Sequence, residues 1–224
     1  MGKRTDLPND CHLALRDLKH ALGEPLPGLP ALLRMATTPR PGGARPPARH
    51  RPRQGGVLLL VYPIGDRLHV ALTRRTEQVA NHKGQISLPG GAREPADRTL
   101  LATALREASE ELGVHSDELQ ILGPLTPFYI PPSDFCIQPF VAYTPRRPSF
   151  RLEPNEVAEL LEMPLALLLD PATRQQGTWE LRNRPVVVPF YRLGKHRIWG
   201  ATAMILSEFE VLLTEARDAH GGPV

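Results

Sequence analysis

The chain has 224 residues, of which 41% are hydrophobic and 23% are charged, a balance that excludes an intrinsically disordered protein. Its 27 basic and 24 acidic residues leave a formal net charge of +3, too small to indicate a nucleic-acid partner by itself. The two cysteines, Cys11 and Cys136, exclude a disulfide framework and allow either one bridge or two reduced thiols. No run of about 18 apolar residues predicts a membrane span, and no apolar signal sequence follows Met1, so we expect a cytoplasmic protein without a membrane partner.

The first 55 residues differ in composition from the rest. Leucines at helical spacing predict a short amphipathic helix over 10–22. Eight prolines between Pro25 and Pro52 then predict an extended segment without regular helix or central strand. We therefore expect residues 1–55 to form an N-terminal helix with a proline- and arginine-rich arm, and residues 56–224 to form one globular domain.

The arm also carries a basic run without an acidic residue, made of Arg40, Arg45, Arg49, Arg51 and Arg53. We interpret this run as a solvated segment, because charge runs of this kind commonly face water. A nucleic-acid partner is not expected, because no aromatic residue lies between the arginines to stack on bases.

The globular domain shows strand and helix patterns in alternation. The predicted strands are 57–62, 68–73, 119–122, 136–144 and 186–191, and the predicted helices are 99–112 and 203–219. A tight turn over 64–67 joins the first two strands into a hairpin, and Gly113 ends the first helix. A hairpin without repeated strand–helix units predicts a mixed-sheet α/β sandwich.

The helix over 99–112 carries three carboxylates in one stripe, Glu107, Glu110 and Glu111, which a helical wheel places away from the apolar face. Like charges three and four residues apart destabilise a helix, and its C-terminal end disfavours anions. A hard divalent cation such as Mg²⁺ or Mn²⁺ would offset that cost, because it prefers oxygen ligands. A solvated acidic face is the alternative.

The residues around this stripe resemble the signature of the Nudix hydrolases. Arg106 to Val114 reads REASEELGV and matches the C-terminal part of the Nudix box, R-E-U-x-E-E-x-G-U, in which U is a bulky apolar residue. Upstream, the match departs from the pattern: counting from Gly91, the acidic position falls on Asp97, and eight residues rather than seven separate it from Arg106. The resemblance implies an α/β/α sandwich with a mixed sheet and a catalytic loop and helix.

Flanking segments narrow the resemblance to the coenzyme A pyrophosphatase-like branch of the family. These segments are 72–76 (LTRRT) and 82–91 (HKGQISLPGG), followed by further similarity that extends over roughly residues 35–209. The branch commonly carries an arginine near position 80, where this chain has Ala80.

The resemblance implies a metal-dependent pyrophosphohydrolase that uses Mg²⁺ or Mn²⁺. Its metal ligands would be Glu107, Glu110, Glu111 and the Gly90 carbonyl, and Arg106 would pair with an acidic neighbour to join loop and helix. Arg74, Arg75 and Lys83 are the candidate substrate-binding residues, because guanidinium and ammonium groups suit phosphates.

The sequence does not decide which residue is the general base. It could be Glu110 or Glu111, or a glutamate of a later loop, Glu156 or Glu159, each of which we interpret instead as a solvated carboxylate at a helix start.

Within this branch the expected substrate is a small nucleotide-containing molecule, coenzyme A or a derivative, cleaved to 4′-phosphopantetheine and 3′,5′-ADP. The alternatives are another nucleoside diphosphate derivative, such as ADP-ribose, and a non-catalytic Nudix-like binding module. The complete carboxylate stripe argues against the binding module. Relatives of this type also suggest a homodimer.

Overall fold

A computed structural model describes residues 9–42, 45–77, 84–181 and 183–220. Lys83, a predicted substrate-binding residue, and His82 lie outside these described residues. In the described part of the chain, eight strands form a mixed sheet in the order β3-β2-β1-β7-β5, with β4 paired to β1, β6 to β7 and β8 to β2. These strands are β1 Arg53–Ile64, β2 Arg67–Arg75, β3 Ile86–Ser87, β4 Gly90–Ala92, β5 Gln120–Pro124, β6 Phe128–Ile130, β7 Phe135–Tyr143 and β8 Val157–Pro164.

The predicted hairpin and mixed sheet are confirmed. β1 and β2 are antiparallel and joined by a turn at Gly65, whose φ of 61° favours a residue without a β-carbon. β1 and β7 are parallel, with Val57 opposite Pro139 and Leu60 opposite Ala142.

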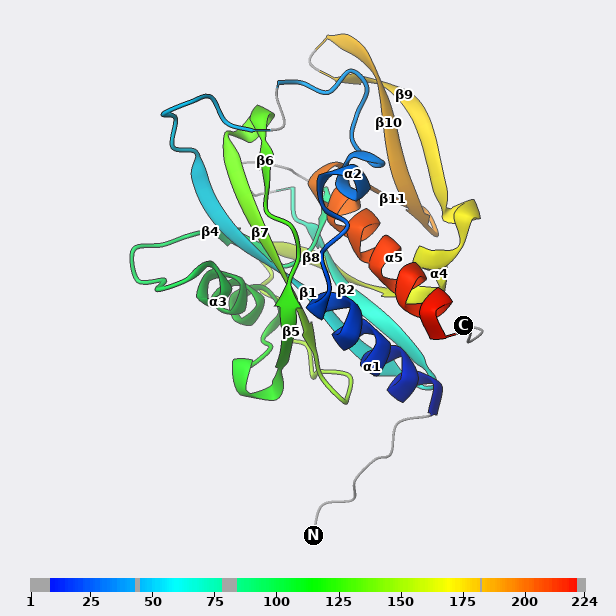
Figure 1. Ribbon diagram of the computed structural model, residues 1–224. Helices are drawn as coiled ribbons and strands as arrows, with labels where there is room; N and C mark the ends of the chain where they lie inside the picture. Colours follow the sequence, from blue (N-terminus) through cyan, green and yellow to red (C-terminus); the bar gives the residue numbers. More distant parts are fainter. Residues whose placement is uncertain (1–8, 43–44, 78–83, 182, 221–224) are drawn as a thin grey trace.

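Helices cover both faces of this sheet, as Figure 1 shows. Helix α3 (Leu100–Leu112) packs on one face, where it meets Leu58 and Leu60 of β1. The alternate β1 residues Val57, Leu59 and Val61 face a larger core with helix α5 (Gly200–His220). This alternation buries both faces of β1 and produces the predicted α/β/α sandwich.

The N-terminal segment packs against the sandwich. Helix α1 (Asn9–Gly23) and helix α2 (Gly28–Leu33) lie against α5, and Leu18, Leu32 and Met35 are fully buried in the same core. The buried Glu208 carboxylate of α5 accepts hydrogen bonds from the backbone N–H groups of Gly28 and Thr126, both at 3.0 Å.

The expectation of no helix between Pro25 and Pro52 is therefore wrong at α2. Pro30 lies in the first turn of this helix, where its missing N–H is not needed for a helical hydrogen bond. Beyond α2, Thr38 forms an isolated bridge with Val187, and Arg40 donates to the Tyr129 carbonyl at 3.0 Å. The division of the chain at residues 55 and 56 stays a prediction.

A second, three-stranded antiparallel sheet follows helix α4 (Leu165–Leu169). It contains β9 (Arg174–Leu181), β10 (Arg184–Leu193) and β11 (His196–Trp199), of which the sequence predicts only part of β10. Three short 3₁₀ helices, η1 Ser116–Glu118, η2 Pro131–Ser133 and η3 Pro171–Thr173, complete the elements of the described residues.

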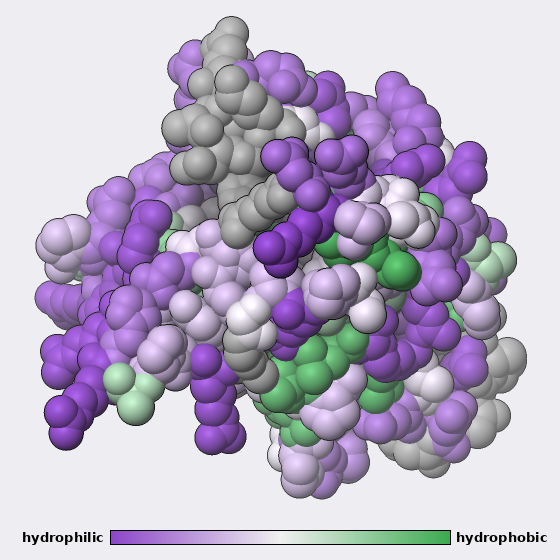
Figure 2. All heavy atoms as spheres, turned by 90° about the horizontal axis from the view of Figure 1, so that it is seen from above, coloured by the Kyte–Doolittle hydropathy of each residue, from purple (hydrophilic) through white to green (hydrophobic). Residues whose placement is uncertain are grey.

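The surface of the described residues is mainly polar. Figure 2 shows hydrophilic side chains over most of the face seen from above, with smaller hydrophobic areas between them. Large hydrophobic side chains are exposed at Leu33 and Ile121. Among the described helices, none combines the length and the apolar character that a membrane span requires. The homodimer stays a prediction, and Cys136 is a free, half-buried thiol.

Candidate active site

Helix α3 has defined signals at both ends. The Thr99 side chain accepts a hydrogen bond from the Ala102 N–H at 3.1 Å, and Gly113 ends the helix in the left-handed conformation with a φ of 69°. Gly56 of β1 lets the helix start close to the sheet, because a β-carbon there would lie 2.1 Å from the Leu100 carbonyl oxygen. Signals at the two ends of α3 and a glycine on the strand beneath it thus fix the position of α3 on the sheet.

The glycine-rich loop before α3 lies directly against its carboxylates. A β-carbon at Gly91 would lie 2.3 Å from Glu107 Oε1, so a side chain at this position would displace the carboxylate. Gly90 has a φ of 154° and packs against Val57 of β1. The two glycines therefore allow backbone and carboxylate to approach each other closely.

Glu111 is the most deeply buried carboxylate of the site. Its side chain is 2% exposed, and the Glu111 Oε2 atom has no hydrogen-bond partner. The Arg75 guanidinium lies 3.5 Å from Glu111 Oε1. Burial raises the pKa of the Glu111 carboxyl to about 8, against the opposing effect of Arg75, and the charges of Glu107 and Glu156 raise this pKa further.

The helical wheel is wrong for Glu111, which it places on the solvent side. The segment between β7 and β8 crosses the end of the helix, where the backbone N–H groups of Glu153 and Arg151 donate hydrogen bonds to the carbonyls of Glu111 and Leu112. A wheel takes account of one packed face, whereas the Glu111 side chain lies beside Arg75 of β2 and the Gly90 backbone.

Glu107 and Glu110 both contact Arg106. The Arg106 Nη2 atom lies 3.0 Å from Glu107 Oε1, and Arg106 Nη1 lies 2.8 Å from Glu110 Oε2. Glu107 is half-buried and its pKa is raised, mainly by burial and against the effect of Arg106, whereas the Glu110 side chain is 56% exposed.

Arg106 also joins the helix to the loop before it. Its guanidinium donates to both carboxylate oxygens of Asp97, each at 3.2 Å, and to the Ala92 carbonyl at 3.1 Å. Asp97 further accepts from the Glu94 N–H and the Thr103 hydroxyl. The hydrogen bonds from Arg106 lower the pKa of Asp97 to about 2. We call Arg106 with Asp97, Glu107 and Glu110 the Arg106 network.

The predicted substrate-binding arginines have different surroundings. Arg75 lies beside Glu111, within the candidate site. The Arg74 side chain instead donates to Glu159 at 2.9 Å, and His196 lies 3.5 Å from the same carboxylate. Neighbouring positions on a strand point to opposite faces, so the two arginines are directed to different sides of β2.

The structure shows the surroundings of two acidic residues, Asp97 and Glu156, whose roles the sequence does not decide. Asp97 pairs with Arg106 in spite of the inserted residue between them, a contact that the acidic position before the box could have indicated. Glu156 lies near the two buried carboxylates, since its charge raises the pKa of both Glu107 and Glu111. The expected helix start at Glu156 and Glu159 is wrong, because Glu159 lies on strand β8, paired with β2.

Comparison with known proteins decides the family. The NUDIX domain family matches residues 52–184, more than half of the chain. The chain belongs to the Nudix hydrolase family. The Nudix relationship, and with it hydrolysis of pyrophosphate bonds, is thereby confirmed as predicted.

Relatives of this Nudix hydrolase include bacterial and human proteins. The uncharacterized Nudix hydrolase NudL of Pectobacterium atrosepticum is 35% identical over 176 residues, which cover 74% of this chain and 85% of that protein. The human mitochondrial coenzyme A diphosphatase NUDT8 is also 35% identical over 176 residues, which cover 76% of this chain and 73% of NUDT8. Among solved structures, a MutT/nudix family protein from Enterococcus faecalis superposes with a TM-score of 0.52 at 16% identity, covering 79% of this chain and 70% of that one, and supports the fold.

Nudix hydrolases generally require divalent cations, and the carboxylates of this chain fit one. Within the described residues, no three His, Cys, Asp or Glu side chains already converge as a metal site. However, Glu111 carries a buried oxygen without a partner, and Glu107 lies against the backbone of the glycine-rich loop. A buried carboxylate oxygen without a partner is costly, and a hard cation with oxygen ligands would remove that cost.

Proposed function

We propose that this Nudix hydrolase cleaves the diphosphate of coenzyme A or one of its derivatives, releasing 4′-phosphopantetheine and 3′,5′-ADP. The observation that carries the proposal is the similarity to human NUDT8, named a coenzyme A diphosphatase, over 76% of this chain. The similarity includes the box and its flanking segments, in which Arg74, Arg75 and Lys83 precede the glycine-rich loop.

We further propose that Glu107, Glu110, Glu111 and the Gly90 carbonyl hold the divalent cation, Mg²⁺ or Mn²⁺. When bound, such a cation lowers the pKa of water and neutralises charge that develops on the leaving phosphate. The proposal is supported by the unpartnered Glu111 oxygen and by the close approach of Glu107 to Gly91.

The other residues would orient the reacting groups. Arg75, next to Glu111, is suited to bind a non-bridging oxygen of the diphosphate, because a guanidinium matches phosphate geometry. Arg106 would hold α3 against the glycine-rich loop through Asp97 and the Ala92 carbonyl. Glu156, near both buried carboxylates, joins Glu110 and Glu111 as a candidate acceptor of the proton from the attacking water.

A substrate panel tests the proposal. Purified protein with Mg²⁺ or Mn²⁺ is incubated with coenzyme A, ADP-ribose, NADH and a dinucleoside polyphosphate, and the products are identified by mass spectrometry. We expect the fastest hydrolysis with coenzyme A and equal amounts of 4′-phosphopantetheine and 3′,5′-ADP. Hydrolysis of ADP-ribose without hydrolysis of coenzyme A would reject the proposal in favour of the alternative substrate class. The predicted cytoplasmic location stays a prediction, since NUDT8 is named a mitochondrial protein.

A further inference from the structure

The last two residues of the arginine run, Arg51 and Arg53, line a basic pocket that the catalytic residues leave unexplained. A cavity of about 690 Å³ opens where β1 begins, beside the glycine-rich loop. Its polar and charged lining comes from two parts of the chain, the end of the arginine run and the residue after β4: His50, Arg51, Arg53, Gln54 and Arg93. No carboxylate lines the pocket among the described residues, so its charge is positive.

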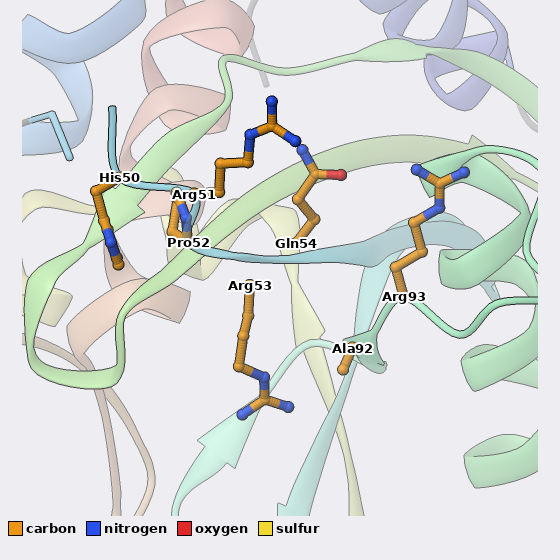
Figure 3. A pocket seen from close by; sticks show the side chains of 7 residues that line it. All are labelled: His50, Arg51, Pro52, Arg53, Gln54, Ala92 and Arg93. Carbon is orange, nitrogen blue, oxygen red and sulfur yellow. The ribbon is translucent and has the colours of Figure 1, made fainter. Parts of the chain in front are cut away.

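Three donors of the pocket point the same way. Figure 3 shows the side chains of Arg51, Gln54 and Arg93 on one side of the β1 ribbon and that of Arg53 on the other. Arg53 stacks over the Phe135 ring, 5.1 Å from its centroid, which accounts for its different direction. Two guanidinium groups with an amide between them form a set of N–H donors that suits the oxygens of a phosphate.

These arginines lack a counter-charge. Arg93 is held in place by the backbone carbonyls of Asp97 and Arg98, at 3.1 and 3.3 Å, neither of which neutralises it. Arg51 has no hydrogen bond or ion pair within the described residues. The Asp134 carboxylate, nearby on the chain preceding β7, is engaged by His50 at 2.7 Å and by the Tyr129 hydroxyl at 2.9 Å.

The pocket borders the candidate active site through Ala92. This residue lines the pocket, and its carbonyl accepts the hydrogen bond from Arg106, which also contacts Glu107. A ligand whose diphosphate lies at the carboxylates would reach the pocket by passing along the glycine-rich loop at Ala92.

We propose that Arg51, Gln54 and Arg93 bind a phosphomonoester of the substrate that is separate from the diphosphate under attack. This inference rests on the proposed function, because coenzyme A carries such a group, the 3′-phosphate of its ribose. 3′-Dephospho-coenzyme A and ADP-ribose lack this group. The pocket thus selects the substrate class, and the diphosphate site performs the hydrolysis.

Kinetics on two matched substrates test the assignment. The variant Arg51→Gln removes one guanidinium, and Arg45→Gln, an exposed arginine of the same segment outside the pocket, is the matched control. We expect Arg51→Gln to lower kcat/KM for coenzyme A by about tenfold and to leave 3′-dephospho-coenzyme A unchanged, since a charge-assisted contact to the 3′-phosphate is lost. Arg45→Gln should change neither. Equal use of both substrates by the wild type, or an equal or absent loss in Arg51→Gln, would overturn the assignment.

A binding experiment separates this inference from the proposed function. If the wild type hydrolyses neither substrate, the proposed function fails, and calorimetry still compares 3′,5′-ADP with 5′-AMP. Tighter binding of 3′,5′-ADP that Arg51→Gln abolishes supports the pocket, whereas equal binding of the two nucleotides contradicts it. A single-stranded oligonucleotide that binds through Arg51 and is not displaced by 3′,5′-ADP would assign the pocket to nucleic acid and would also overturn the proposal.

Discussion

Helix α3 contacts two buried carboxylates, Asp97 of the loop before it and its own Glu111, and their surroundings differ. In the Arg106 network, each carboxylate has a hydrogen-bonded cation, and the pKa of Asp97 falls to about 2. At Glu111, one carboxylate oxygen has no partner, and the pKa rises to about 8. Both Asp97 and Glu111 are buried, at 6% and 2% exposure, so burial alone does not explain the difference.

The difference between Asp97 and Glu111 indicates which carboxylate stabilises the fold and which one serves the reaction. A buried carboxylate with a full set of partners stabilises the fold, whereas one that keeps an oxygen without a partner costs free energy and is typical of a functional site. We therefore expect changes at the Arg106–Asp97 pair to act first on stability and changes at Glu111 to act first on activity.

The largest expected effect follows from Glu111→Gln. The amide keeps the shape of the side chain but cannot ligate a cation as a carboxylate does, so kcat/KM for the diphosphate substrate should fall by about 100-fold or more. The free energy of unfolding should stay constant or rise, because a buried carboxyl with one unpartnered oxygen is replaced by an amide of the same shape. Steady-state kinetics and denaturant unfolding measure the two quantities, and Glu118→Gln, at an exposed position of η1, serves as the control. Undiminished turnover would remove Glu111 from the metal ligands.

The next largest effect is a loss of stability in the variant Arg106→Gln. This variant leaves Asp97 buried without its cation, and we expect the free energy of unfolding to fall by about 2 kcal/mol, less than for a fully buried pair because Arg106 is partly exposed. Urea denaturation measures the change against Arg98→Gln, an exposed arginine in the same loop. A variant as stable as the control would show that the network does not join loop and helix.

A smaller effect on kcat/KM should distinguish Arg75 from Arg74, its neighbour on β2. Arg75→Gln should lower kcat/KM by about tenfold, because it removes a guanidinium from the site beside Glu111. Arg74→Gln removes the same charge from a half-buried pair with Glu159 at the protein surface. A surface ion pair contributes about 0–1 kcal/mol, and the change should alter kcat/KM less than twofold. Equal losses in the two variants would contradict the different directions of these side chains.

The sequence predicts those parts of the molecule that depend on local pattern. The hairpin around Gly65, the helix that ends at Gly113 and the carboxylates of the Nudix box all follow from short-range signals. Two features depend instead on chain segments distant in sequence: the burial of Glu111 beside Arg75 of β2 and the Gly90 backbone, and the packing of α1 and α2 on α5. Neither composition nor helical periodicity contains that information.

For Asp97, the spacing to Arg106 departs from the Nudix pattern, but the side chain still pairs with Arg106. One inserted residue shifts Asp97 from the expected distance to Arg106, yet a loop absorbs an extra residue more easily than a helix does. The half-buried Arg106 guanidinium pairs with a carboxylate, and the loop supplies Asp97.

The last prediction concerns the contribution of Asp97 to stability and its dependence on pH. Its pKa is about 2 in the folded protein and 3.8 ordinarily, so its contribution to stability is fully present above about pH 4 and is lost as the pH falls toward 2. The wild type should therefore have a higher Tm than Asp97→Asn at pH 7, and this difference should shrink between pH 4 and pH 2. In an Arg106→Gln background the difference should be smaller at every pH, because the hydrogen bonds that lower the pKa come chiefly from Arg106. A Tm difference that is independent of both pH and Arg106 would mean that Asp97 acts through its contacts with Thr103 and the Glu94 backbone. The contrast between Asp97 and Glu111 would then rest on Glu111 alone.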